Sequence, residues 1–461
     1  MAKHETSEKA LEASKRNLDV LVNDYMGYLD LARTPTKAVR AAVAMLEGKG
    51  FVKYNENMKF GSARRVYFVD RNNVNIAAVA LGQKPITLGL NIAGAHVDFC
   101  TLTNKVVSAV EKSDGVYLDT RPYGGFYAHQ WMDRPLNVIG ETLVKSENEE
   151  RQLVEWQMAG NIPEPTIHNP KGYKDGTKAY NDMFSLENLD VFTGYTNLQS
   201  FLWAVNRASS NALLRSDLWI TKSDFNSGFN LFHVVPAEKT QKMGKYIIGY
   251  GHDDRACMFS ALEAITSVQN QEYTSIALGV AREEIGSTSV GSANDIFIEQ
   301  VIKALFNLTG VWTDIQSVFT RSVMLSADVD IAYTPQNAHV SDKDNCAQFG
   351  KGAAIVIANG SSGNPTGNII MPNDLAYIER FLDKRDLAYQ VTALPSKVGI
   401  GGGGGTIAEY YSQKGILTAD LGVPVGNMHG TTSRIYAADL DSTVEAFRAL
   451  FERAEQRKQW D

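Results

Sequence analysis

The sequence predicts an α/β protein with a mostly parallel-stranded central sheet flanked by helices, and with a β-rich domain inserted into it. Three observations predict this class. From about residue 244 onward, short apolar runs alternate with longer runs of helical periodicity. Two helical patterns and three strand-like runs precede residue 100, and a hairpin-rich, irregular stretch separates the two parts. We therefore expect a discontinuous domain over residues 1–100 and 239–461, and an inserted domain over residues 101–238.

The elements before residue 100 begin with two helices. Apolar residues recur at helical spacing over residues 6–32, and a second helix over residues 36–47 ends at Gly48. Three strand-like runs follow, namely "RRVYFVD", "NVNIAAVAL" and "LGLNIAGAHVD".

The inserted stretch has a different character. An Asp-Gly turn inside "KVVSAVEKSDGVYLDTRPYGG" predicts a hairpin. Residues 145–190 are rich in Asn, Lys, Glu, Pro and Gly, so we expect them to be irregular. After them, "TNLQSFLWAVNRASSNALL" predicts a helix and "NLFHVVPAEK" predicts a strand.

The C-terminal half carries the strand and helix alternation that indicates a parallel sheet. The predicted strands are "KYIIGYG", "YTSIALGVA", "SVMLSAD", "AAIVIA" and "GILTADLG". The predicted helices are "RACMFSALEAITSVQ", "NDIFIEQVIKALFNLTG", "NDLAYIERFLDKRD" and "STVEAFRALFERAEQ".

Composition excludes several functional classes. The 461 residues are 44% hydrophobic and 21% charged, which is typical of a globular protein of two or three domains. The net charge of −7 and the lack of a basic stretch argue against nucleic acid as a partner. No apolar run approaches the roughly 20 residues that cross a bilayer, so we expect no membrane association. The polar N-terminus does not resemble a secretory signal, and we expect a cytoplasmic protein.

The three cysteines do not indicate a thiolate site. Cys100, Cys257 and Cys346 lie far apart without paired spacing. This spacing argues against a disulfide framework and against a zinc site built from thiolates.

Acidic and imidazole side chains follow the predicted strands. In open α/β sheets, ligands bind beyond the carboxyl ends of the strands. The residues at these positions are His96, Asp98, Asp253, Asp254, Glu283, Glu284, Asp328 and His429. A single buried histidine or a Glu-Glu pair is more often a core group or a surface turn, but the joint pattern favours a site. Imidazole and carboxylate without cysteine suit zinc, manganese, cobalt or iron, and a metal pair about 3.5–4 Å apart recurs in aminopeptidases.

Six segments resemble, in order, motifs of one family of dinuclear metallopeptidases. The segments are "AGAHVDFC", "YGGFYAHQWMDRPL", "GHDDRACMFSALEAI", "AREEIGSTSVGSA", "LSADVDIAYTPQN" and "VGNMHGTTSR". They resemble the aspartyl aminopeptidase / aminopeptidase I family, and the "GYGHDDRAC" and glycine-rich segments resemble its bacterial branch. The resemblance implies a zinc-peptidase-like catalytic domain, with the insertion as a dimerisation and lid domain.

The resemblance also implies a role for each site residue. It assigns the ligands of two divalent metal ions, zinc first and cobalt or manganese as alternatives, to His96, Asp254, Glu284, Asp328 and His429. Asp254 corresponds to the aspartate that bridges both ions. Glu283 resembles the general base, and Asp98 is expected to orient the imidazole of His96.

Substrate contacts are expected from two further segments. His168 resembles a histidine that relatives use near the substrate, sometimes across a subunit boundary. The run "IGGGGGT" lacks the features of a phosphate or dinucleotide loop. We interpret it as a turn whose amides, including those of Gly403 and Gly404, bind a substrate oxygen, with a flexible linker as the alternative. For His129 and Asp133, an interface role and a substrate role both stay open.

The implied function is removal of the N-terminal residue from unblocked peptides by a water that two metal ions activate. The N-terminal residue is acidic or neutral to hydrophobic. The resemblance implies a homo-oligomer in which dimers form a tetrahedral dodecamer. The sequence departs from the family motifs at Asp253, Arg255, Arg282, Ile331 and Gly430. These departures keep open a catalytically impaired metal-binding assembly protein as the alternative, and the glycine run keeps open a nucleotide-binding enzyme.

Overall fold

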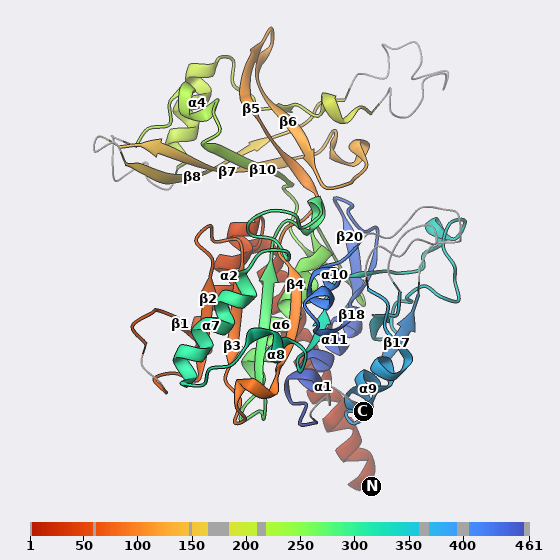
Figure 1. Ribbon diagram of the computed structural model, residues 1–461. Helices are drawn as coiled ribbons and strands as arrows, with labels where there is room; N and C mark the ends of the chain where they lie inside the picture. The colour runs from red at the N-terminus through yellow and green to blue at the C-terminus, as the bar shows by residue number, and fades with distance from the viewer. Residues whose placement is uncertain are drawn as a thin grey trace. The chain divides into compact units, whose positions relative to one another are not determined.

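The computed structural model describes residues 2–58, 61–146, 150–164, 184–209, 218–358, 368–393 and 405–455, with side chains of the first helix from Asn17 onward. Its contacts divide the chain into two compact units (Figure 1). The first comprises Met1–Phe99, Thr240–Met428 and Thr432–Asp461, and the second comprises Cys100–Lys239 and His429–Thr431. Among the described residues, none of the helices combines the length and the apolar character that a bilayer span requires.

A nine-stranded mixed sheet forms the centre of the first unit. Its strands, in spatial order, are β1 (Val52–Lys53), β2 (Arg65–Val69), β3 (Ile76–Ala80), β13 (Thr274–Val280), β4 (Leu90–His96), β14 (Val323–Ser326), β18 (Leu417–Gly422), β16 (Ala353–Val356) and β17 (Tyr389–Thr392). The four central strands β13, β4, β14 and β18 are parallel to their neighbours within that group. Strand β3 pairs antiparallel with β2 and β13, and β16 pairs antiparallel with β18.

Helices cover both faces of this sheet and bury it completely at its centre. One core joins the sheet to α1 (Ala2–Leu31), α2 (Pro35–Gly48), α6 (His252–Ser267), α9 (Pro372–Asp383) and α11 (Ala437–Phe451). The other core joins it to α7 (Phe297–Thr309), α8 (Ile315–Phe319) and α10 (Ala408–Gln413). Along β4, Ala93 and Ala95 face the first core, whereas Leu90 and Ile92 face the second. Burial of both faces explains the almost continuous apolar runs of these strands.

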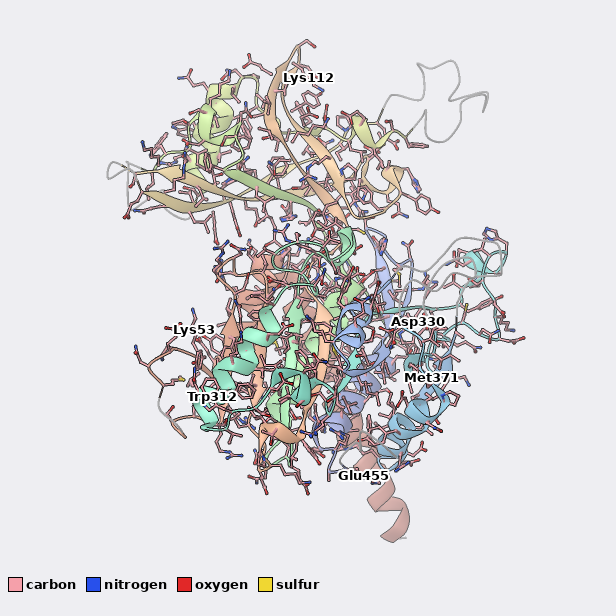
Figure 2. All side chains as sticks on the ribbon, viewed as in Figure 1. Lys53, Lys112, Trp312, Asp330, Met371 and Glu455 are labelled. Carbon is pink, nitrogen blue, oxygen red and sulfur yellow. The ribbon has the colours of Figure 1, made fainter. Side chains whose placement is uncertain are left out.

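A second, smaller sheet lies in the first unit. Its order is β11 (Gln241–Met243), β12 (Tyr246–Gly249), β20 (Ser433–Tyr436), β19 (Pro424–Gly426) and β15 (Asp330–Ile331). The expectation that "KYIIGYG" belongs to the central sheet is therefore wrong, because β12 pairs antiparallel with β11 and β20. A short turn is enough to join antiparallel strands, whereas a parallel neighbour needs a long crossover. Asp330, labelled in Figure 2, accepts a hydrogen bond from the Thr392 hydroxyl at 2.8 Å and links this sheet to β17.

The second unit is built on a six-stranded antiparallel sheet. Its order is β8 (Arg151–Gly160), β7 (Leu136–Lys145), β10 (Asn230–Pro236), β5 (Thr101–Lys112), β6 (Gly115–Tyr123) and β9 (Val191–Phe192). The predicted hairpin is confirmed, since β5 and β6 pair from Lys112 and Gly115. The predicted helix is α4 (Leu198–Arg207), and a short helix α5 (Lys222–Phe225) precedes β10.

Strand β8 is the longest strand, together with β7, among the elements that the sequence patterns did not predict. It lies inside the stretch expected to be irregular, yet it pairs with β7 over its whole length. Val154 and Trp156 are buried, but the apolar Leu153 is 46% exposed, and the polar Gln152 shares the side of the strand with Val154. Apolar and polar residues therefore alternate over only part of the strand. Five 3₁₀ turns complete the described elements: η1 (Ile86–Leu88), η2 (Ala128–Trp131), η3 (Leu186–Asn188), η4 (Glu283–Ile285) and η5 (Pro335–Asn337).

Candidate metal centre

Three parallel strands bring predicted site residues to one edge of the central sheet. His96 is the last residue of β4 and lies opposite Val280, the last residue of β13. Glu283 follows β13 in the turn η4, and Asp328 follows β14 two residues after its end. Because the carboxyl ends of parallel neighbours meet at the same edge, residues far apart in the sequence become neighbours here.

The imidazole of His96 is the centre of this group. It is buried, and its Nε2 lies 3.0 Å from Asp253 Oδ1, 3.9 Å from Asp328 Oδ1 and 4.0 Å from Glu283 Oε2. One donor atom from each of His96, Asp253 and Asp328 lies within 4.8 Å of the other two. Imidazole nitrogen and carboxylate oxygen at this spacing match the donor set that zinc and related divalent metals take.

Asp98 holds two parts of the site at once. The Nδ1 of His96 lies 3.1 Å from the backbone carbonyl of Asp98 and 3.4 Å from its Oδ1. Asp98 thus holds Nδ1 as a hydrogen-bond donor, and in the metal-free protein Nε2 donates to Asp253. A bound metal ion would take the place of the proton on Nε2. The Asp98 carboxylate also accepts the backbone N–H groups of Glu283 and Glu284, each at 3.2 Å. The sequence motif predicted the first contact but gave no sign of the second.

The two adjacent aspartates at the start of α6 have different surroundings. Asp253 points its carboxylate at His96 Nε2, whereas Asp254 Oδ2 accepts the backbone N–H of His96 at 3.1 Å. Helix α6 begins with non-helical dihedral angles at both residues, and a cis peptide bond joins them. The structure therefore places Asp253, and not the expected Asp254, beside the His96 ring. A sequence signal for this existed. The expectation of Asp254 rests on aligning the family motif at Cys257, three residues later, whereas aligning it at Phe259 selects Asp253.

Burial and mutual repulsion determine the protonation of the group. Burial raises the pKa of Glu283 to about 8, although His96 lowers it, and Glu284 and Asp98 raise it further. Burial likewise raises the pKa of the Asp328 and Asp254 carboxyls well above their usual range. Burial lowers the pKa of His96, but its hydrogen bonds to Asp253 and Asp98 outweigh that effect and raise it well above the usual value.

This electrostatic pattern fits a divalent cation. Several buried carboxylates that repel one another would be relieved by a doubly charged ion among them. In addition, Asp254 is fully buried, and its Oδ1 has no hydrogen-bond partner among the described residues. The chemistry of the donor set and the excess of negative charge therefore agree on metal binding.

Comparison with known proteins identifies the lineage of this site. Residues 28–451 match the family described as Aminopeptidase I zinc metalloprotease (M18). The chain belongs to the M18 family. This M18 chain is 28% identical over 452 residues to a Thermotoga neapolitana protein named Probable M18 family aminopeptidase 1, with 95% of this chain and 97% of the relative covered.

Solved structures agree on the fold of this M18 protein. The crystal structure of the M18 aminopeptidase from Thermotoga maritima matches with a TM-score of 0.84 and 26% identity, covering 95% of this chain and 97% of that one. The S. cerevisiae structure described as an mApe1 dodecamer matches with a TM-score of 0.73 at 19% identity, over 95% and 97% of the two chains, and supports the fold alone. The α/β class and the family predicted from the six motifs are confirmed, and the protein is a metalloaminopeptidase, a hydrolase of a zinc metalloprotease family.

The remaining predicted residues do not belong to the group of His96, Asp253 and Asp328, or they are outside the described part of this M18 chain. Glu284 is half-buried in η4. His429 belongs to the second unit, where its Nδ1 lies 2.7 Å from the carbonyl of Gly125. His168, Gly403 and Gly404 lie outside the described residues. The roles of these residues stay predictions.

Proposed function

We propose that this aminopeptidase removes the N-terminal residue of unblocked peptides with a water that two divalent metal ions activate, and with Glu283 as the general base. One observation carries the proposal. His96, Asp253 and Asp328 converge within 4.8 Å, and the Glu283 carboxylate lies 4.0 Å from the same imidazole nitrogen. A general base beside a metal-ligand cluster is the arrangement that hydrolysis at a metal centre requires.

The ligand assignment follows the observed contacts. His96, Asp253 and Asp328 would hold one ion, and Asp253 would take the role that the family resemblance assigns to Asp254. Asp254 supports the site from behind through the backbone of His96. Glu284 and His429 remain the proposed ligands of the second ion. Zinc suits this nitrogen and oxygen donor set, with cobalt and manganese as alternatives.

Glu283 is suited to moving a proton. When bound, the metal ions polarise the peptide carbonyl and lower the pKa of water. Glu283 accepts the proton of the attacking water and returns it to the leaving amine. Its side chain is 17% exposed, so it is shielded from solvent without being sealed off. Asp98 fixes it in place by accepting the backbone N–H of Glu283.

The proposal includes the substrate and the assembly. The N-terminal residue is acidic or neutral to hydrophobic, and His168, Gly403 and Gly404 contact the peptide. The chain assembles as dimers into a tetrahedral dodecamer in the cytoplasm, with the second unit as the dimerisation and lid domain. The resemblance to the aminopeptidase I family supports this assembly.

The test is a specificity screen on metal-free protein restored in turn with zinc, cobalt and manganese. Unblocked peptides with acidic, neutral and hydrophobic first residues should release that residue, and the same peptides with an acetylated N-terminus should not. Chelator should abolish the release. If the protein binds metal but releases nothing from any unblocked peptide, the impaired alternative holds and the proposal fails.

A further inference from the structure

A fully buried arginine lies directly behind the candidate metal centre. Arg255, in the first turn of α6, has no exposed surface and is among the largest buried side chains of the described residues. Its Nε donates to the carbonyl of Gly251 at 2.9 Å, and its terminal nitrogens donate to the carbonyls of Tyr250, at 3.3 Å, and Ala32. A planar guanidinium can satisfy several acceptors with one rigid group, and a lysine cannot.

The turn before α6 is built around this guanidinium. Gly251 has a left-handed φ of 79°, and a Cβ at this position would lie 1.1 Å from an Arg255 terminal nitrogen. The glycine is therefore required both by its backbone conformation and by the space that the guanidinium occupies. Asp253 lies between Gly251 and Arg255 in the sequence. The close packing of the guanidinium against Gly251 therefore fixes the backbone that carries the Asp253 carboxylate.

The same guanidinium contacts the other ligand-bearing segment. Its central carbon lies 3.9 Å from the centroid of the Phe99 ring, which is a cation–π contact. Phe99 is buried, follows Asp98 directly, and packs edge-on against Tyr250 with centroids 5.4 Å apart. Arg255 thus contacts Gly251, near Asp253, and Phe99, near His96.

Arg255 is a charged group in this environment. Burial lowers its pKa to about 10, so the guanidinium stays protonated at neutral pH. A buried charge is unfavourable unless polar groups compensate it, and here carbonyls and aromatic faces do so.

We propose that Arg255 is a positioning residue of the metal centre. It clamps the Gly251–Asp254 turn against the His96–Phe99 segment, so that the donor atoms of Asp253 and His96 are held at metal-binding distance before an ion arrives. The inference depends on the proposed metal ligands.

The test measures zinc binding by the metal-free protein, not turnover. Zinc affinity is determined by competition with a chromogenic chelator for the wild type, Arg255→Met and Arg255→Lys, with thermal melting of each. Residues that orient metal ligands typically change metal affinity about 10–100-fold. We expect a loss of that size in Arg255→Met and a partial recovery in Arg255→Lys, which keeps the charge but not the planar fork.

Arg453→Met is the matched control. Arg453 is also buried and donates from its Nε to Asn91 Oδ1 at 2.9 Å, but Asn91 lies near the start of β4 and His96 at its end. The Arg453→Met variant should have a lower melting temperature than the wild type and the same zinc affinity. If Arg255→Met does not fold, Gly251→Ala displaces the guanidinium without deleting it and should also weaken zinc binding.

The outcomes separate this inference from the proposed function. Zinc affinity that is unchanged in the folded Arg255 and Gly251 variants, with only a lower melting temperature, overturns the positioning role and leaves the metal centre intact. A wild type that binds no zinc would refute the metal centre itself.

Discussion

Adjacent glutamates in this protein have different surroundings, and we propose different tasks for them. Glu283 and Glu284 are neighbours in one 3₁₀ turn, and Asp98 binds the backbone N–H of both. The Glu283 carboxylate lies 4.0 Å from His96 Nε2, and it is the one proposed to move a proton. At the residue scale, the role proposed for Glu283 follows from the position of its carboxylate, because Glu284 is of the same residue type.

Glu283→Gln should separate proton transfer from metal binding. The amide keeps the size of the side chain but cannot accept the proton, so kcat should fall by about 10²–10⁴-fold while zinc content stays at the wild-type value. The measurement is peptide release together with elemental analysis. Glu272→Gln is the control and should leave kcat and zinc content unchanged. Glu272 precedes β13 and forms an ion pair with Lys84. Zinc loss in Glu283→Gln would show that this residue is a ligand.

The two aspartates of α6 give a second residue-scale prediction. Asp253→Asn weakens the carboxylate donor that faces His96 Nε2, so zinc affinity should fall by at least about 10-fold. Asp254→Asn retains an oxygen that can accept the backbone N–H of His96 and should lose less. Titration of both metal-free variants with zinc checks the order, and a greater loss in Asp254→Asn would return the ligand role to Asp254.

The metal-free protein should lose stability as pH rises. Glu283 has a folded pKa of about 8 against an ordinary value of 4.5, so the folded state binds its proton more tightly than the unfolded state. This contribution is complete below pH 4.5 and is lost as pH rises through 8. The raised pKa values of Asp328 and His96 act in the same direction.

Urea unfolding between about pH 5 and pH 8 measures this effect. The free energy of unfolding of metal-free Glu283→Gln should decline less over the range than that of the metal-free wild type. Zinc-loaded wild type should decline less as well, because the cation stabilises the ionised carboxylates. Identical pH profiles for wild type and Glu283→Gln would show that Glu283 is not protonated in the folded metal-free protein.

At the scale of elements, close approaches between strands place the ligands. Gly422, at the end of β18, would direct a Cβ to within 1.9 Å of the backbone oxygen of Asp328. A backbone atom cannot move aside as a flexible side chain can. Because residue 422 is a glycine and has no side chain, the backbone of Asp328 can approach β18 as closely as observed.

Gly422→Ala and Gly27→Ala should have opposite effects. The first forces β18 and the Asp328 segment apart, which should lower the free energy of unfolding by about 1–3 kcal/mol and weaken zinc binding. Gly27 lies within α1, and no neighbouring atom comes within 4 Å of the position that a Cβ would take, so alanine there should raise that free energy by about 1 kcal/mol. Chemical denaturation measures the free energy of unfolding of the two variants, and zinc titration measures their zinc affinity. Wild-type zinc affinity in Gly422→Ala would show that β18 does not position Asp328.

At the scale of the whole molecule, the proposed assembly can be tested directly. The proposed dodecamer predicts that sedimentation velocity of the purified chain shows one species of about twelve protomers. The experiment is run at several protein concentrations, so that a weak equilibrium is distinguished from a closed assembly. A species of two protomers at every concentration would contradict the dodecamer.

Sequence alone determined the order of most elements and the family of this protein. Apolar periodicity located the long helices and the buried central strands, because burial on both faces leaves a strong hydrophobic signal. Periodicity failed at β8, where Gln152 and Leu153 interrupt the alternation of apolar and polar residues, and at β12, where a strand pattern does not reveal its partner. Six motifs in order were enough to predict the M18 family.

Only the tertiary structure decided which donors converge. Sequence placed acids after several strands, and the choice between Asp253 and Asp254 depended on which residue anchors the motif alignment. The structure decides it, because the backbone at the irregular start of α6 directs Asp253 at the His96 ring. Sequence could not foresee that Arg255 fills the space left by Gly251 and stacks on Phe99. The contacts of this helix start with His96 and Phe99 join residues about 150 positions apart, and local patterns carry no information about them until the chain is packed.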